Sequence, residues 1–177
     1  MRPASADLVS GPAPVDVSVA VHEYEGRAAQ AVRRLKYERV LSHVDEMAAE
    51  MSSLAVALGL AESDLVVPVP IHWSRHCERG FNQSLLLASG FERCDLKALK
   101  RIRRTRQQVG LTPEQRLSNL KDAFRAGENA RGKTVLLIDD VITSGGTARE
   151  CAKALKAAGA IKVDLLTYCA GGSVYDA

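Results

Sequence analysis

Two of the uninterrupted apolar runs in the chain lie at residues 65–70 and 135–138. Such runs, bounded by turn residues, are typical of strands buried on both faces of a parallel sheet. A third segment, residues 15–21, alternates valine with polar or small residues and predicts a half-buried strand. A last strand is expected at residues 162–168. Hydrophobic patterning therefore indicates a central parallel sheet.

Helical spacing of Ala, Met and Leu fills much of the chain between these strands. The expected helices are residues 28–35, 44–58, 82–87, 112–120 and 147–158. The helix at 112–120 has a clear start, with Thr112 as N-cap and Pro113 in the first turn. A short strand is expected at residues 95–99. Residues 135–168 have the length of one right-handed strand–helix–strand crossover. The pattern predicts one α/β domain over residues 15–177, behind a disordered lead-in at residues 1–14 that is rich in Ala, Ser, Gly and Pro.

The strongest chemical signal follows the apolar run at residues 135–138. Asp139 and Asp140 come directly after it, where the crevice of an open α/β sheet binds ligands. The next loop contains Thr143, Ser144, Gly145 and Gly146, and the backbone N–H groups of such a loop can surround an anion. Thr147 and Glu150 form a capping-box pattern, so the amino terminus of a helix would face the same anion. The stretch predicts a phosphate on the loop and sugar hydroxyls on the acids, although an ordinary buried strand with a polar turn is the simpler alternative.

Charge and cysteine usage narrow the class of protein. The net charge is only +3, but residues 100–106 carry five basic side chains, which favours a solvated face or contact with nucleic acid. Aromatic residues make up 5% of the chain and none interrupts this run, which argues against a stacking platform for single strands. The four cysteines have no C-x-x-C spacing, so we expect free thiols in a reducing compartment. No apolar run approaches 18 residues and no signal peptide is recognisable, so we expect a cytoplasmic protein without a membrane span.

Two basic loops are candidates for a second phosphate group. Arg75 and Arg79 follow the strand at residues 65–70, and arginine forks match phosphate oxygens. Lys100, Arg101 and Arg103 open a long polar loop, and loops of that kind often act as lids. A solvated loop is the alternative in both cases. His72 and His76 lack a third ligand at a suitable spacing, so we predict no metal site in the protein itself.

Residues 127–134 read G-E-N-A-R-G-K-T and formally match the phosphate loop of nucleoside triphosphatases. That loop must follow a strand and open a helix, whereas this segment follows a polar turn and opens the strand at residue 134. The context therefore argues against a triphosphatase.

The apolar run, the acids Asp139 and Asp140, and the loop Thr143–Thr147 resemble the phosphoribosyl pyrophosphate (PRPP) signature of type I phosphoribosyltransferases. The resemblance implies a central parallel sheet flanked by helices, with a small hood and a flexible loop. It also implies that the acids hold the ribose hydroxyls and that the loop, including Thr147, holds the 5′-phosphate. Purine-salvage members usually carry a third acid where this chain has Thr143. The candidate subfamilies are therefore orotate-type enzymes and relatives outside salvage.

Further residues resemble the ComF/GntX family within that superfamily. They are Lys36-Tyr37, Val67-Pro68-Val69-Pro70, Arg79-Gly80-Phe81-Asn82-Gln83, Arg101, Thr105, Gln108, Leu111, Arg116, Asn119 and Phe124. The resemblance covers nearly everything from Tyr24 to Tyr168 and implies a role in natural competence, the uptake and handling of transforming DNA. Many members carry a four-cysteine zinc ribbon ahead of this domain, and we expect this protein to lack it.

Three functions follow from these residues and resemblances. The first is a catalytic one, displacement of pyrophosphate from ribose C1, with Mg²⁺ on the pyrophosphate and the arginines and lysines of the two basic loops holding the leaving group. The second is a binding module that senses PRPP or a nucleotide and acts through competence proteins. The third is direct binding of single-stranded DNA by residues 100–106. The sequence indicates neither the acceptor base nor whether the protein forms a homo-oligomer.

Overall fold

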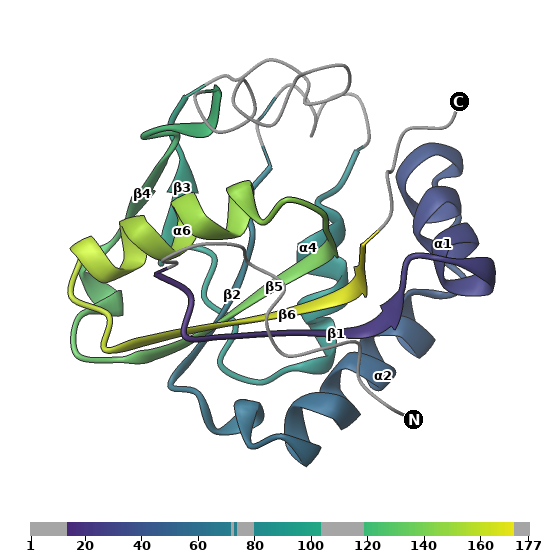
Figure 1. Ribbon diagram of the computed structural model, residues 1–177, viewed down its shortest axis with the longest axis horizontal. Helices are drawn as coiled ribbons and strands as arrows, with labels where there is room; N and C mark the ends of the chain where they lie inside the picture. The colour runs from purple at the N-terminus through teal and green to yellow at the C-terminus, as the bar shows by residue number, and fades with distance from the viewer. Residues whose placement is uncertain (1–13, 72, 74–79, 104–118, 172–177) are drawn as a thin grey trace.

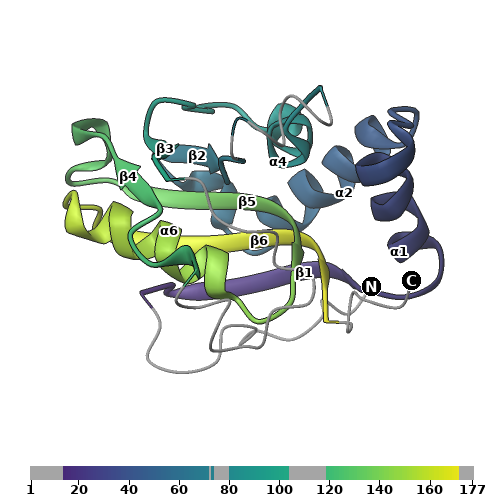
Figure 2. The ribbon, with the colours of Figure 1, turned by 90° about the horizontal axis from the view of Figure 1, so that it is seen from above.

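The computed structural model describes residues 14–71, 73, 80–103 and 119–171. Its centre is a parallel sheet of four strands in the order β1-β6-β5-β2, and Figure 2 shows them side by side in this order. Two further strands, β3 and β4, form a separate antiparallel pair. The strands are β1 (Val17–Glu23), β2 (Leu65–Pro68), β3 (Leu99–Arg101), β4 (Phe124–Ala126), β5 (Thr134–Ile142) and β6 (Lys162–Ala170). The predicted α/β fold with a central parallel sheet is confirmed.

Helices cover both faces of the sheet. In Figure 1, α6 lies above the strands and α2 lies below them, and α1 stands beyond the carboxyl ends of the parallel strands. The α-helices are α1 (Gly26–Arg33), α2 (Val44–Ala57), α4 (Gln83–Leu87) and α6 (Gly146–Ala157). The shorter turns are the π-helix η1 (Arg34–Glu38) and the 3-10 helices η2 (Leu60–Glu62), η3 (Ala88–Gly90) and η4 (Glu128–Ala130). We assign α1 and η1 to the predicted hood.

The apolar run of β5 separates two hydrophobic cores. Val135 and Leu137 belong to the core under α6, whereas Leu136 and Ile138 belong to the core shared with α1, α2 and α4. All four residues are at most 1% exposed. Alternate residues of a strand point to opposite faces, so this run can serve both cores only because each face is covered. The sequence prediction of a doubly buried strand is thus confirmed.

Three sequence expectations need correction. β1 is buried on both faces rather than one. Ser18 and Ala20 lie on the face that the sequence pattern predicted to be exposed, and both are buried. The short strand expected at residues 95–99 lies further along the chain as β3, because its residues Leu99–Arg101 are the ones that pair with β4. β5 does not stop at Ile138; it continues to Ile142 because β6 is equally long and pairs with it along most of its length.

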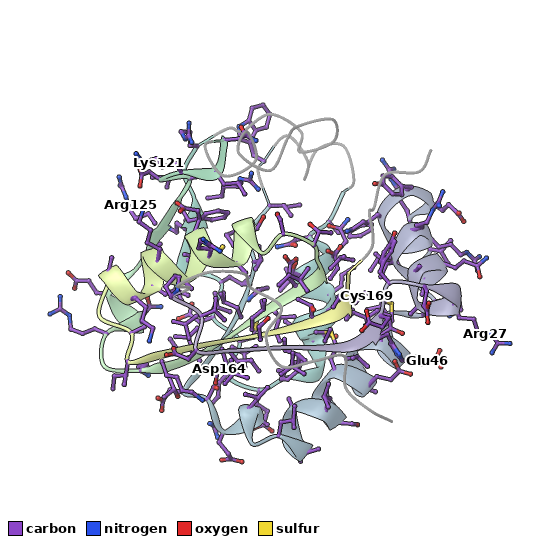
Figure 3. All side chains as sticks on the ribbon, in the orientation of Figure 1. Arg27, Glu46, Lys121, Arg125, Asp164 and Cys169 are labelled. Carbon is purple, nitrogen blue, oxygen red and sulfur yellow. The ribbon has the colours of Figure 1, made fainter. Side chains whose placement is uncertain are left out.

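Several expectations fall partly or wholly on residues outside the described ones: the lead-in at 1–13, Cys77, and most of the helix expected at 112–120. Among the described cysteines, Cys94, Cys151 and Cys169 are free thiols, as expected. Figure 3 labels Cys169 near the α1 end of the sheet and Asp164 nearer its other end. Within the described ranges, no helix combines the length and the apolar character that crossing a bilayer requires.

Residues 127–134, which match the triphosphatase loop in sequence, lead into a strand as their sequence context predicted. Residues 128–130 form the short turn η4 after β4, and residue 134 begins β5 rather than a helix. Gly132 donates its N–H to Gly159 O, at the opposite end of the sheet from the carboxyl ends of the strands. No helix amino terminus follows the lysine, so the segment lacks the phosphate cradle of those enzymes.

Candidate functional site

The carboxyl end of β5 borders a cavity of about 60 Å³ that opens to solvent. Asp139 lines it from β5, and Leu165 and Thr167 line it from β6. The remaining wall is formed by the end of β5, the β5–α6 connection and the start of α6, and it includes every residue predicted to hold the 5′-phosphate: Thr143, Ser144, Gly145, Gly146 and Thr147. One acid and the whole predicted loop therefore meet in one cavity.

The start of α6 differs from the expected capping box. Gly145, with φ 70° and ψ 2°, is the N-cap, and as a glycine it provides no side-chain cap. Thr147 lies inside the first turn, and Glu150 instead accepts a hydrogen bond from the N–H of Asp122. Glycine adopts this left-handed conformation at little cost, so the helix starts earlier than the sequence pattern indicated. The first turn of α6 forms part of the cavity wall, so an anion in the cavity would face the positive end of the helix dipole.

Asp139 is held through one of its two carboxylate oxygens. Oδ1 accepts hydrogen bonds from Ser84 Oγ at 2.8 Å and from the N–H of Asp140 at 2.9 Å. No described residue donates to Oδ2, and the side chain is half-buried in the cavity wall. Burial and the neighbouring Asp140 carboxylate raise the pKa of Asp139 to about 7, although the Ser84 hydroxyl and the Lys36 ammonium oppose this rise. Asp139 can therefore exchange a proton near neutral pH.

Asp140 does not line the cavity, contrary to the expectation that both acids face the same crevice. Neighbouring residues of a strand point to opposite faces. Asp140 Oδ2 lies 3.0 Å from Nζ of Lys36, and the two side chains are only 10% and 17% exposed. Lys36 comes from the π-helix η1, whose Leu35 packs in the core of α1 and α2. The pair fixes the hood to the end of β5.

Three residues of the site were not recognised from the sequence. Lys36 was noticed only through the family resemblance, and no role could be derived for it. Ser84 and Thr167 carried no sequence signal, because their importance depends on which strand or helix lies beside Asp139. Thr167 is the register partner of Asp139 in the sheet and is fully buried.

The lid candidates either do not line the cavity or fall outside the described residues. Arg75 and Arg79 are among the latter. Lys100 and Arg101 belong to β3, and Arg101 stacks over the ring of Phe124 at 5.3 Å. Arg103 donates to the carbonyls of Asn119 and Lys121 and so links the two ends of the segment at 104–118. Lys121 and Arg125 lie at the same outer side of the molecule in Figure 3.

Within the described ranges, no three His, Cys, Asp or Glu side chains converge as metal ligands.

Comparisons with known proteins agree with this geometry. Residues 81–176 match the family model described as the phosphoribosyl transferase domain. The chain is 34% identical to the DNA utilization protein YhgH of Escherichia coli over 89% of this chain and 74% of that protein. It is 31% identical to competence protein F of Haemophilus influenzae over 85% of this chain and 71% of that protein, and 29% identical to competence protein ComFC of Bacillus subtilis over 76% and 56%.

Two solved structures resemble part of the chain. One is described as the allosteric regulatory enzyme of purine biosynthesis, with 20% identity and a TM-score of 0.44. The other is the glutamine PRPP amidotransferase of B. subtilis in complex with ADP and GMP, with 21% identity and a TM-score of 0.45. The matches cover 68% and 70% of this chain, which spans only about a quarter of each of those chains.

Proposed function

Because the chain belongs to the ComF-like family of type I phosphoribosyltransferase-domain proteins, we propose that it binds PRPP, or a related ribose phosphate, together with Mg²⁺. The observation that carries the proposal is the single cavity that contains Asp139 and the complete loop Thr143–Thr147. The 5′-phosphate would accept hydrogen bonds from the loop and from the first turn of α6. The free Oδ2 of Asp139 would accept from a ribose hydroxyl.

Magnesium fits this donor set. It prefers hard oxygen ligands, keeps several waters and is commonly held by one or two carboxylates together with substrate phosphates. The PRPP pyrophosphate and waters would supply most of these oxygens, which leaves Oδ2 of Asp139 to the ribose hydroxyl. When bound, the ion would neutralise charge that builds up on the leaving pyrophosphate.

We propose that a catalytic form of the protein replaces pyrophosphate at ribose C1 with a nitrogen of an acceptor base. The bond from C1 to the pyrophosphate oxygen breaks and the pyrophosphate keeps the electron pair. The acceptor nitrogen forms the new bond to C1, and its proton passes to the pyrophosphate or to water. Positive charge develops on the sugar in between, and the Asp139 carboxylate would stabilise it electrostatically. Asp140, paired with Lys36, would hold the end of β5 in place from the other face.

The biological setting follows from the relatives. They are named for DNA utilization and for competence, so we propose that ribose-phosphate binding by this chain serves DNA uptake. The ligand would be a small phosphorylated sugar or nucleotide rather than the transforming DNA itself.

Titration with PRPP and Mg²⁺ in a calorimeter tests the proposal. We expect saturable binding by the wild-type protein and at least a tenfold loss of affinity in Asp139→Asn combined with Asp140→Asn, because the sugar hydroxyl loses its charged acceptor. Glu128→Gln is the control, since Glu128 is exposed on η4 before the start of β5. A double variant that binds PRPP as tightly as the wild type would refute the proposal.

A pyrophosphate-release assay over a panel of bases separates an enzyme from a binding module. An enzyme forms pyrophosphate with at least one base and loses this activity in the double variant. A binding module forms none, but PRPP at a hundredfold excess over its Kd stabilises the fold by about 2.7 kcal/mol.

The glycine N-cap of α6 offers a second test. Gly145→Ala places a side chain at φ 70° and should lower the free energy of unfolding by about 1 kcal/mol. Gly59→Ala is a matched control, because Gly59 has φ 70° and ψ 11° and its Cβ would contact nothing. Both variants should lose similar stability by urea denaturation, but only Gly145→Ala should weaken PRPP binding, by about tenfold, since only its Cβ enters the phosphate loop. Equal affinities in the two variants would exclude this loop as the phosphate site.

A further inference from the structure

Asp139 is connected to α4 by a closed ring of hydrogen bonds. Val69 donates its N–H to Ile138 O at 2.9 Å, and Asn82 Nδ2 donates to Val69 O at 3.0 Å. The N–H of Ser84 donates to Asn82 Oδ1 at 3.1 Å, and Ser84 Oγ donates to Asp139 Oδ1 at 2.8 Å. The ring leaves β5 at Ile138 and returns to it at the next residue. Asn82 thus does more than cap a short helix, because both ends of its amide are used to place Ser84 against β5.

We propose that Asn82 and Ser84 form a positioning clamp for Asp139, which turns the carboxylate so that Oδ2 alone faces a ribose phosphate in the cavity. The inference deepens the proposed function and rests on it for the identity of the ligand. Ser84 is a positioning residue, because it acts through Asp139.

The arrangement of donors favours this role over simple helix capping. Oδ1 takes both donors, Ser84 Oγ and the N–H of Asp140, and Oδ2 takes none from the described residues. Ser84 is 2% exposed, so water hardly competes for its hydroxyl. A carboxylate with one oxygen fixed and one oxygen open presents a single, oriented acceptor to a sugar hydroxyl.

The clamp also acts on the charge of Asp139. A hydroxyl that donates to a carboxylate favours its ionised form. The other groups that influence Asp139 are the Asp140 carboxylate on the same strand and the Lys36 ammonium from η1, and the neutral thiol of Cys151 lies near it on α6. All three stay in place when Ser84 is changed, so a shift in the titration of Asp139 would report on the hydroxyl alone.

The test compares Ser84→Ala with Ser84→Thr, which keeps the hydroxyl, and with Ser53→Ala. Ser53 is an exposed helical serine whose Oγ donates to Ala49 O, so its loss controls for removal of a serine hydroxyl. The carboxyl carbon of Asp139 is titrated by NMR in the free protein, and Asp139→Asn identifies its signal. We expect Ser84→Ala to raise the midpoint by about one pH unit and Ser84→Thr to restore it. Calorimetry with PRPP and Mg²⁺ at pH 7 should show about tenfold weaker binding only in Ser84→Ala.

The proposal fails if Ser84→Ala folds and Asp139 titrates as in the wild type, or if Ser84→Thr does not restore the midpoint. Should Ser84→Ala fail to fold, Ser84→Cys, which has nearly the same size and a weaker donor, must give an intermediate midpoint. The NMR titration needs no ligand. Absence of PRPP binding together with the expected shift would therefore refute the proposed function and leave the clamp intact.

Discussion

Replacing Lys36 with methionine is expected to lower the free energy of unfolding by about 3 kcal/mol. The change removes the cation 3.0 Å from Asp140 and keeps most of the volume of the side chain. Asp140 is 7% exposed and would stay behind as a buried carboxylate without its counter-ion. Breaking a buried ion pair from one side typically costs about 3–5 kcal/mol, because the remaining charge is desolvated and uncompensated. Urea denaturation at pH 7.5 measures the loss.

Two further variants decide whether the pair is responsible. Lys153→Met is the control, because Lys153 is 54% exposed and its carboxylate partners are 3.7 and 4.0 Å away; it should change stability by less than about 1 kcal/mol. Adding Asp140→Asn to Lys36→Met removes the uncompensated carboxylate charge and should recover a large part of the lost stability. If Lys36→Met unfolds at the same urea concentration as Lys153→Met, the hood is not held by this pair.

The features that the sequence predicted correctly are local or repeated along the chain. The apolar run at residues 135–138 identified β5, because a strand buried on both faces needs four consecutive apolar residues to fill two cores. The loop Thr143–Thr147 was recognisable because its hydroxyl-bearing residues and glycines follow one another without a gap, shortly after the acids Asp139 and Asp140. The loop lies in the wall of a cavity next to Asp139, and phosphate binding there stays a prediction.

The features that sequence reasoning missed depend on contacts between distant segments. Ser84 bonds to Asp139 across 55 positions of sequence, and nothing near Ser84 indicates the partner. Lys36 reaches Asp140 only because η1 follows α1 past the carboxyl end of the sheet. The alternation of faces along β5 could have been applied to the two adjacent acids, and it would have predicted that only one of them lines the cavity.

The misplaced helix start has a physical explanation as well. Thr147 and Glu150 have the spacing of a capping box, which is a favourable but small contribution to stability. Gly145 can turn the chain in the left-handed region two residues earlier, which adds helical hydrogen bonds and brings Glu150 to the N–H of Asp122. The sequence pattern alone does not show whether that tertiary contact or the local cap contributes more to stability.

Replacing Asp139 with asparagine is expected to change how stability depends on pH. The folded protein raises the pKa of Asp139 from 3.8 to about 7, so between these values the folded state binds more protons at this group than the unfolded state does. The contribution of this group to stability is therefore complete below pH 3.8 and is lost as the pH rises through 7. Asparagine does not titrate, and its amide oxygen can still accept from Ser84. The free energy of unfolding of Asp139→Asn, relative to the wild type, should thus increase by up to about 4 kcal/mol between pH 4 and pH 8.

Denaturation curves at several pH values between 4 and 8 test this sign, and Asp64→Asn supplies a contrast of opposite direction. Hydrogen bonds from the backbone and side chain of Thr134 lower the pKa of Asp64, so its contribution to stability is present above the ordinary value and is lost only as the pH falls below about 4. Asp64→Asn should therefore run parallel to the wild type from pH 5 to pH 8, whereas Asp139→Asn should diverge from it. Parallel curves for Asp139→Asn would mean that Asp139 is ionised throughout this range, and the cavity would then hold a permanent negative charge beside its phosphate loop.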